Sequence, residues 1–248
     1  MVDLAKFVQD VVPTTCVYLE DSYLQSESAH VLKAVEEKNM AYVALDRTIF
    51  HPRAGGQPSD QGTLEGESFR VDVKRAMLHA GVIIHYGKAD GKPDGVATCK
   101  IDWPNRFLLM KRHTAAHLLD YCLATATSSR VETTDSWLGD DPYVGYGGPI
   151  YSGLDLERLT GLANSYVQRG LNVETRILDR TDAERLIADA PNISRLPRRE
   201  KLRIVTIEGQ LAIPCGGTHV RNLNEIGAVE VRRAEPVDTG FRLHFEVK

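Results

Sequence analysis

Two pairs of potential metal ligands lie far apart in the sequence and share one internal spacing. His113 and His117 are four residues apart, as are Cys215 and His219, which have two glycines between them. Residues at i and i+4 of a helix share one face, so both imidazole rings of the first pair can reach one ion. The glycines permit a bend that turns the Cys215 thiolate and the His219 ring toward one point. Such a tetrahedral set of histidines and a cysteine favours zinc over magnesium or calcium.

Each pair by itself also has a simpler interpretation. The two histidines can be exposed or can lie at the edge of a core, and the cysteine can be incidental to a tight turn. A metalloprotease is excluded, because Thr114 stands where that motif requires a glutamate. If all four ligands stay bound to an ion, the site is structural. A labile ligand or an expanded coordination sphere would instead admit water or a substrate.

A third motif consists of Gly55, Gly56 and Gln57, inside the segment from Phe50 to Gly62. Glycine lets a ligand approach the backbone closely, and the Gln57 side chain can both donate and accept hydrogen bonds. These properties suit a binding loop, and a plain β-turn between two strands is the alternative.

The elements that must position these residues change type near the middle of the chain. Up to about residue 100, short apolar or alternating runs separated by turn signals predict a small antiparallel β-barrel, with one short helix at Ala29–Glu37. The strands are expected at Thr15–Glu20, Met40–Leu45, Phe69–Val73, Ala80–Tyr86 and Val96–Ile101.

Beyond Asp102 the pattern becomes mixed, and the sequence predicts an α+β domain with an antiparallel sheet and helices. A helix begins near Pro104 and carries the first histidine pair, and a polar loop is expected at Ser128–Gly148. Further helices are expected at Leu154–Arg169 and Thr181–Ala188, and strands at Val173–Ile177, Leu202–Ile207, Ile226–Val231 and Phe241–Val247. We therefore expect a barrel domain over residues 1–102 that contains the glycine motif, and a metal-binding domain over residues 103–248.

The composition of the 248-residue chain is that of an ordinary globular protein, with 42% hydrophobic residues and a net charge of −4. Its 4 cysteines are too few for a disulfide scaffold and form no C-x-x-C pair, which favours a reducing compartment. We find no apolar run of the roughly 20 residues that a membrane helix needs, and no signal-peptide core at the N-terminus. The sequence thus predicts a cytoplasmic protein.

Taken together, the motifs resemble the editing domain of alanyl-tRNA synthetase and, more closely, its freestanding relatives, the AlaX trans-editing proteins. The similarity is carried by Leu45 to Gly62, Ile101 to Leu119 and Cys215 to Gly227, and it runs from about Cys16 to the C-terminus. No aminoacylation domain precedes these motifs, so the chain resembles the medium-length, two-domain AlaX class.

The resemblance implies hydrolysis of mischarged aminoacyl-tRNA, usually Ser-tRNA(Ala) and sometimes Gly-tRNA(Ala). It implies zinc ligation by the four residues of the two pairs, and it places Gly55, Gly56 and Gln57 near the tRNA acceptor end or the editing pocket. Gln57, Thr114 and Thr218 are predicted as catalytic residues, because each can hydrogen-bond a substrate or water, although local packing or capping also accounts for the two threonines. The segment Thr133–Gly139 departs from the family pattern, and its Trp137 either shapes the amino-acid pocket or caps the sheet.

Basic clusters can contact the phosphates of a tRNA acceptor stem, with an ordinary solvated surface as the alternative. Because the net charge is −4, bulk charge does not drive such binding. The clusters are Arg195, Arg198, Arg199, Lys201 and Arg203, then Lys111 and Arg112, then Arg232 and Arg233.

Two other functions fit the same motifs. One is an aminoacyl-tRNA-dependent transferase in a biosynthetic pathway, which would make an amide instead of a free amino acid. The other is a tRNA-binding module whose zinc is purely structural.

Overall fold

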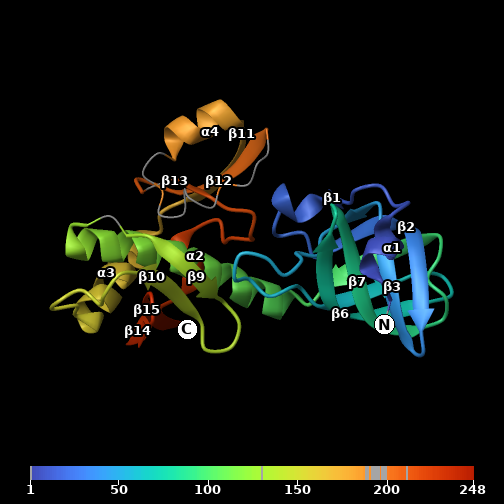
Figure 1. Ribbon diagram of the computed structural model, residues 1–248, viewed down its shortest axis with the longest axis horizontal. Helices are drawn as coiled ribbons and strands as arrows, with labels where there is room; N and C mark the ends of the chain where they lie inside the picture. The colour runs from blue at the N-terminus through green and yellow to red at the C-terminus, as the bar shows by residue number, and fades with distance from the viewer. Residues whose placement is uncertain (1, 130, 188–189, 191–195, 197–199, 211) are drawn as a thin grey trace. The chain divides into compact units, whose positions relative to one another are not determined.

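The computed structural model describes residues 2–129, 131–187, 190, 196, 200–210 and 212–248 (Figure 1). Its contacts divide the chain into two compact units. The first contains the residues up to Ala54 together with Pro58–Leu108. The second contains Gly55–Gln57 and the chain from Leu109 onwards, so the short glycine motif groups with the second unit.

The first unit is a closed antiparallel barrel in the strand order β2-β3-β7-β6-β5-β8. Buried apolar side chains such as Val43, Leu64, Val71 and Ile83 fill its interior. The predicted barrel is therefore confirmed. Its strands are β2 (Ser26–Glu37), β3 (Met40–Leu45), β5 (Gly62–Glu65), β6 (Arg70–His79), β7 (Val82–Asp90) and β8 (Val96–Ile101).

Smaller elements precede and accompany the barrel. Helix α1 (Leu4–Val8) is capped by Asp3, and β1 (Thr15–Cys16) pairs in parallel with β4 (Arg47–Thr48). The strand expected at Thr15–Glu20 is thus short, because the chain turns into the 3-10 helix η1 (Val17–Leu19) directly after it.

The helix expected at Ala29–Glu37 is wrong, since this segment belongs to the strand β2 and makes up all of it except the first three residues. Lysine, alanine and glutamate are good helix formers, but strand β2 pairs with β3 along Val31–Glu37 and with β8 along Ser26–His30. Hydrogen bonds to two neighbouring strands override the local preference.

Helix α2 (Trp103–Thr127) carries the first histidine pair and begins in the first unit. Asp102 caps its first turn by accepting a hydrogen bond from the backbone of Asn105. Arg106, which is fully buried, donates from Nε to Asp60 Oδ1 over 2.8 Å and from its two terminal nitrogens to the carbonyls of Ser22 (3.0 Å) and Ile49 (2.6 Å). These bonds fix the start of the helix.

The second unit contains the four-stranded antiparallel sheet β14-β15-β10-β9 and the three-stranded sheet β11-β12-β13. The predicted α+β class is confirmed. The strands are β9 (Thr133–Trp137), β10 (Tyr143–Gly147), β11 (Val173–Asp179), β12 (Lys201–Ile207), β13 (Ala212–Pro214), β14 (Val229–Val237) and β15 (Gly240–Val247). The helices are α3 (Leu156–Arg169), α4 (Arg180–Leu186) and the 3-10 helix η3 (Leu223–Ile226).

The polar segment Ser128–Gly148 is not a plain loop, because it contains β9 and β10. Tyr146 of β10 is 1% exposed and its ring lies 5.4 Å from that of Phe241 in β15, so tertiary packing makes a strand of a segment that is polar and glycine-rich in sequence. The strand expected at Ile226–Val231 begins later, at Val229, because η3 ends at Ile226.

Candidate metal centre

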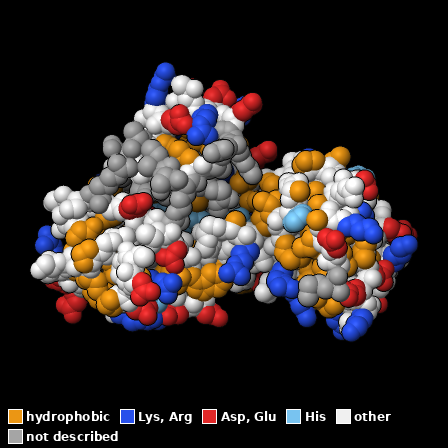
Figure 2. All heavy atoms as spheres, viewed as in Figure 1, with side chains coloured by type: hydrophobic (Ala, Val, Ile, Leu, Met, Phe, Trp, Pro, Cys, Tyr) orange, Lys and Arg blue, Asp and Glu red, His pale blue; other side chains and the backbone are white. Residues whose placement is uncertain are grey.

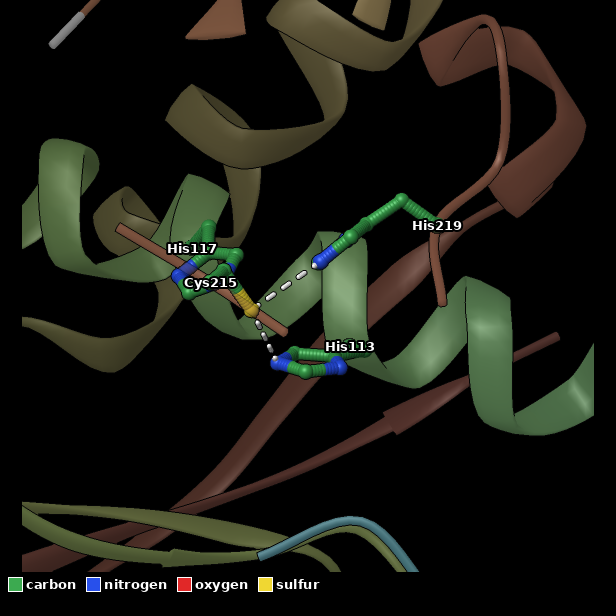
Figure 3. A group of neighbouring side chains, drawn as sticks. All are labelled: His113, His117, Cys215 and His219. Carbon is green, nitrogen blue, oxygen red and sulfur yellow. Dashed lines mark hydrogen bonds between the residues drawn. The ribbon is translucent and has the colours of Figure 1, made fainter. Parts of the chain in front are cut away.

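The four candidate ligands converge in the second unit, although the sequence separates them. His113 and His117 lie one turn apart on α2, and Cys215 and His219 lie in the loop that follows β13 (Figure 3). One donor atom from each of the four lies within 4.8 Å of the others. The Cys215 sulfur is 3.4 Å from Nε2 of His113 and 3.3 Å from Nε2 of His219. The convergence that the two spacings require is therefore present.

The loop that carries Cys215 is held by the neighbouring strand β12. One terminal nitrogen of Arg203 donates to the carbonyls of Cys215 and Gly217, each over 2.8 Å, and the backbone of Cys215 donates back to the carbonyl of Arg203. A Cβ on Gly217 would lie 2.1 Å from Cε1 of His113, so only glycine lets the loop approach the ring this closely.

Gln57 determines the orientation of the His113 ring. Its amide oxygen is identified by the backbone N–H of Thr218, which can only donate and lies 3.1 Å away. The same oxygen accepts from Nδ1 of His113 over 2.9 Å, while the amide nitrogen donates to the Thr218 hydroxyl over 2.8 Å. Gln57 is fully buried. The proton on Nδ1 leaves the lone pair of Nε2 directed at the cluster.

Thr114 determines the orientation of the His219 ring. Its buried hydroxyl donates to the carbonyl of Met110 over 2.9 Å and therefore acts as an acceptor toward its other neighbours. Those neighbours are the backbone N–H of Val220 and Nδ1 of His219, each 3.2 Å away. Nε2 of His219 is again the nitrogen left to bind an ion.

His117 supplies the third imidazole and the clearest sign that the cluster suits a cation. Within the part of the chain that the structure describes, its Nε2 is buried and has no hydrogen-bond partner. Buried polar atoms without a partner are uncommon, and an ion bound among these donors would satisfy this one. The residues present therefore fit a metal that prefers nitrogen and sulfur ligands.

Burial and neighbouring charges shift the pKa values of three residues in the cluster. Burial opposes a charged Cys215, but the adjacent His113 and His219 outweigh it and hold the pKa of the thiol well below its usual range. Burial and His113 also hold the pKa of His219 well below its usual range. Burial works in the same direction on His117, but Asp120 and the Cys215 thiolate raise the pKa of His117 to about 10. The thiolate and the neutral His219 are metal-binding forms, whereas His117 releases a proton when it binds a cation.

The two glycines of the third motif attach Gln57 to the second unit. The Ser136 hydroxyl donates to the carbonyl of Gly55 over 3.3 Å, and the backbone of Leu138 donates to that of Gly56 over 3.0 Å. Gly56 has φ +80°, and a Cβ there would lie 2.3 Å from the Ser136 hydroxyl oxygen. The motif is thus docked against the end of β9 rather than being a plain turn between barrel strands.

Trp137, predicted as a pocket or capping residue, ends β9 and folds over the turn that follows. Its ring nitrogen donates to the carbonyl of Asp140 over 3.1 Å, and a Cβ on Gly139 would lie 2.5 Å from the ring. Its role in binding an amino acid stays a prediction.

Several of the predicted phosphate-binding cations make contacts within the protein, and their role toward tRNA stays a prediction. Arg112 donates to the carbonyls of Leu138 (3.2 Å) and Gly139 (2.6 Å) and to the carboxylate of Glu246 (2.8 Å). Arg203 clamps the ligand loop, and Arg233 pairs with Asp141. Arg195, Arg198 and Arg199 lie outside the described residues, so their predicted role is not tested. On the face drawn in Figure 2, basic and acidic side chains are interspersed.

Among the described helices, none is both long and apolar enough to cross a membrane.

Two protein-family models each match a part of the chain. The model for class II (A) tRNA synthetases matches residues 7–103, and the model for the second additional domain of threonyl and alanyl tRNA synthetases matches residues 202–242. The second match includes both Cys215 and His219.

Individual relatives are more specific. The chain is 37% identical over 239 residues to the alanine–tRNA ligase of Korarchaeum cryptofilum, which covers 94% of this chain and 26% of the ligase. It is 32% identical over 221 residues to the alanyl-tRNA editing protein AlaX-L of Pyrococcus horikoshii, which covers 88% of this chain and 54% of that protein. The chain thus spans about a quarter of the ligase and about half of AlaX-L. It is a relative of the alanyl-tRNA synthetase editing domain and of AlaX, which confirms the predicted resemblance.

Proposed function

We propose that this protein is a zinc-dependent hydrolase that removes the amino acid from mischarged aminoacyl-tRNA. The observation that carries the proposal is the convergence of His113, His117, Cys215 and His219 within 4.8 Å, in a chain that is 32% identical to an alanyl-tRNA editing protein. The proposed substrates are Ser-tRNA(Ala) and Gly-tRNA(Ala), and the products are the free amino acid and the tRNA.

The need for such an activity follows from the limits of binding. A synthetase pocket built for a small side chain cannot strongly reject molecules of nearly the same size. A second site that hydrolyses the wrong ester restores accuracy.

The four ligand residues would hold the zinc ion through Sγ of Cys215 and the Nε2 atoms of the histidines. An ion there supplies Lewis-acid chemistry that favours attack of water on the ester carbonyl. Gln57 and Thr114 contribute by keeping the protons of His113 and His219 on Nδ1. The Thr218 hydroxyl accepts from Gln57, and through it fixes the amide that orients His113. In this proposal the three residues position ligands, and none of them is the general base.

The test is deacylation of Ser-, Gly- and Ala-tRNA(Ala) by the full chain, with identification of the products. We expect free serine or glycine to appear while Ala-tRNA(Ala) is spared. An amide formed with an added amine acceptor would contradict hydrolysis and support the transferase. Binding of tRNA without turnover of any of the three would support the tRNA-binding module.

A further inference from the structure

The carboxylate of Asp120 is buried beside the metal centre, one helical turn after His117. Asp120 is 6% exposed, and Oδ1 accepts hydrogen bonds from the Tyr146 hydroxyl over 2.8 Å and from the Thr133 hydroxyl over 3.3 Å. Tyr146 is itself 1% exposed, so its hydroxyl is held in place by the packing around its ring. One oxygen of Asp120 is therefore anchored to β9 and β10.

The other oxygen faces the metal centre. Oδ2 of Asp120 lies 3.8 Å from Nδ1 of His117. On the opposite edge of the same ring, Nε2 is buried and has no hydrogen-bond partner among the described residues. The ring of His117 thus stands between an anchored carboxylate and the group of ligand atoms.

Asp120 differs from the partners of the other two histidines. Nδ1 of His113 faces the neutral amide of Gln57, and Nδ1 of His219 faces the neutral hydroxyl of Thr114. A divalent cation bound by one thiolate and neutral imidazoles keeps an excess positive charge, which is costly to bury. Asp120 supplies a second negative charge at the one histidine whose partner is ionisable.

We propose that Asp120 is a positioning residue for the metal centre. Across this ion-pair distance its charge favours the proton of His117 on Nδ1 and the ring orientation in which Nε2 faces the ion, and it balances the charge of the bound cation. The proposal rests on the metal centre of the proposed function.

The test is the affinity of the full chain for zinc, measured by competition with a chromogenic chelator. Loss of a carboxylate behind a metal-bound histidine typically weakens affinity by about 10- to 100-fold. We expect a loss in this range for Asp120→Asn, which removes the charge and keeps an acceptor, and a larger loss for Asp120→Ala. Tyr146→Phe keeps the carboxylate but removes the hydroxyl that anchors it, so the loss of zinc affinity should be smaller in this variant. This variant also keeps the test informative if Asp120 variants fold poorly.

Asp135→Asn is the matched control. Asp135 also accepts a hydrogen bond from a tyrosine, over 3.0 Å from Tyr143, but it is paired with Arg242 and not with a histidine. Zinc affinity should be unchanged in this variant. The absorption spectrum of the cobalt-loaded protein provides a second readout, since a reoriented His117 changes the ligand field, and a purely structural role for Asp120 would leave the bands in place.

The outcomes separate the two claims. Zinc binding by the wild-type chain, with unaltered affinity and cobalt spectrum in both Asp120 variants, would overturn the role of Asp120 alone. Failure of the wild-type chain to bind zinc would overturn the metal centre and the role of Asp120 with it.

Discussion

The amide oxygen of Gln57 accepts a hydrogen bond from Nδ1 of His113 over 2.9 Å, which connects the glycine motif to the helix that carries two of the ligands. The two residues are 56 positions apart in the sequence. Because Gln57 also binds the backbone and hydroxyl of Thr218, it joins α2 to the loop that supplies Cys215 and His219. The motif therefore belongs to the framework of the metal centre.

Replacing Gln57 should weaken the centre. Gln57→Ala removes the acceptor for His113 and leaves the backbone N–H of Thr218 buried without a partner, which costs about 1–3 kcal/mol of stability. We expect zinc affinity to fall by about tenfold or more and deacylation to slow. Gln57→Glu keeps an acceptor toward His113 and should retain more affinity. Wild-type zinc affinity and editing kinetics in Gln57→Ala would contradict this role.

The ligand loop should tolerate a methyl group at one of its two glycines and not at the other. In Gly217→Ala the new Cβ would lie 2.1 Å from Cε1 of His113 and 2.8 Å from the amide oxygen of Gln57, so the ring must move. Gly216→Ala is the control, because a Cβ there meets nothing within 4 Å. Zinc content after dialysis should fall in the first variant and stay at the wild-type level in the second. Equal zinc content in both variants would contradict the close approach of Gly217 to the His113 ring.

The barrel should become less stable in mild acid because of His85. Its Nδ1 donates to the carbonyl of Val43 over 3.1 Å, and its Nε2 accepts from the Thr48 hydroxyl over 2.8 Å, so the buried ring is neutral. Burial lowers the pKa of His85 from 6.5 to about 4. Between these pH values the unfolded chain takes up a proton on His85 that the folded chain does not. The stability that the neutral His85 ring contributes to the fold is therefore present above pH 6.5 and is lost as the pH falls toward 4.

Urea unfolding of the wild-type chain and of His85→Gln measures this loss of stability in mild acid. The neutral amide cannot titrate, so between pH 7 and pH 5 the variant should lose about 2 kcal/mol less unfolding free energy than the wild type. Parallel pH dependence of the two proteins would mean that folding does not lower the pKa of His85, which contradicts the burial of a neutral ring.

Much of the fold could be predicted because the deciding pattern is local. The alternation of apolar and polar residues predicted most barrel strands. The helical spacing of apolar residues predicted α2, with both of its histidines on one face. The wrongly predicted segments are those whose structure is determined by pairing with a strand that is distant in the sequence. Lys33 to Glu37 forms a strand because β3 lies beside it, and Tyr143–Gly147 forms one because β15 pairs with it.

The site shows the same division between local and distant information. The spacing of four positions within each pair suggested a metal site, and the resemblance to AlaX implied that all four residues are its ligands. The contacts from Gln57 to His113 and from Thr114 to His219 could not, since they join residues that only the folded chain brings together. Asp120 follows His117 by three residues on the same helix, a local signal that the sequence analysis missed.

The central claim is that one ion held by these ligands is required for deacylation, and Cys215 tests it most directly. Zinc content and hydrolysis of Ser-tRNA(Ala) would be measured on the same samples of wild type, Cys215→Ala and Cys122→Ala. Cys122 is a buried cysteine of the same unit, and burial raises the pKa of its thiol to about 12, so it serves as the matched control. We expect about one zinc per chain and active hydrolysis in wild type and Cys122→Ala, and the loss of both in Cys215→Ala, because removal of a thiolate ligand weakens the site. Full zinc content with unchanged hydrolysis in Cys215→Ala would contradict the ligand assignment and the mechanism built on it.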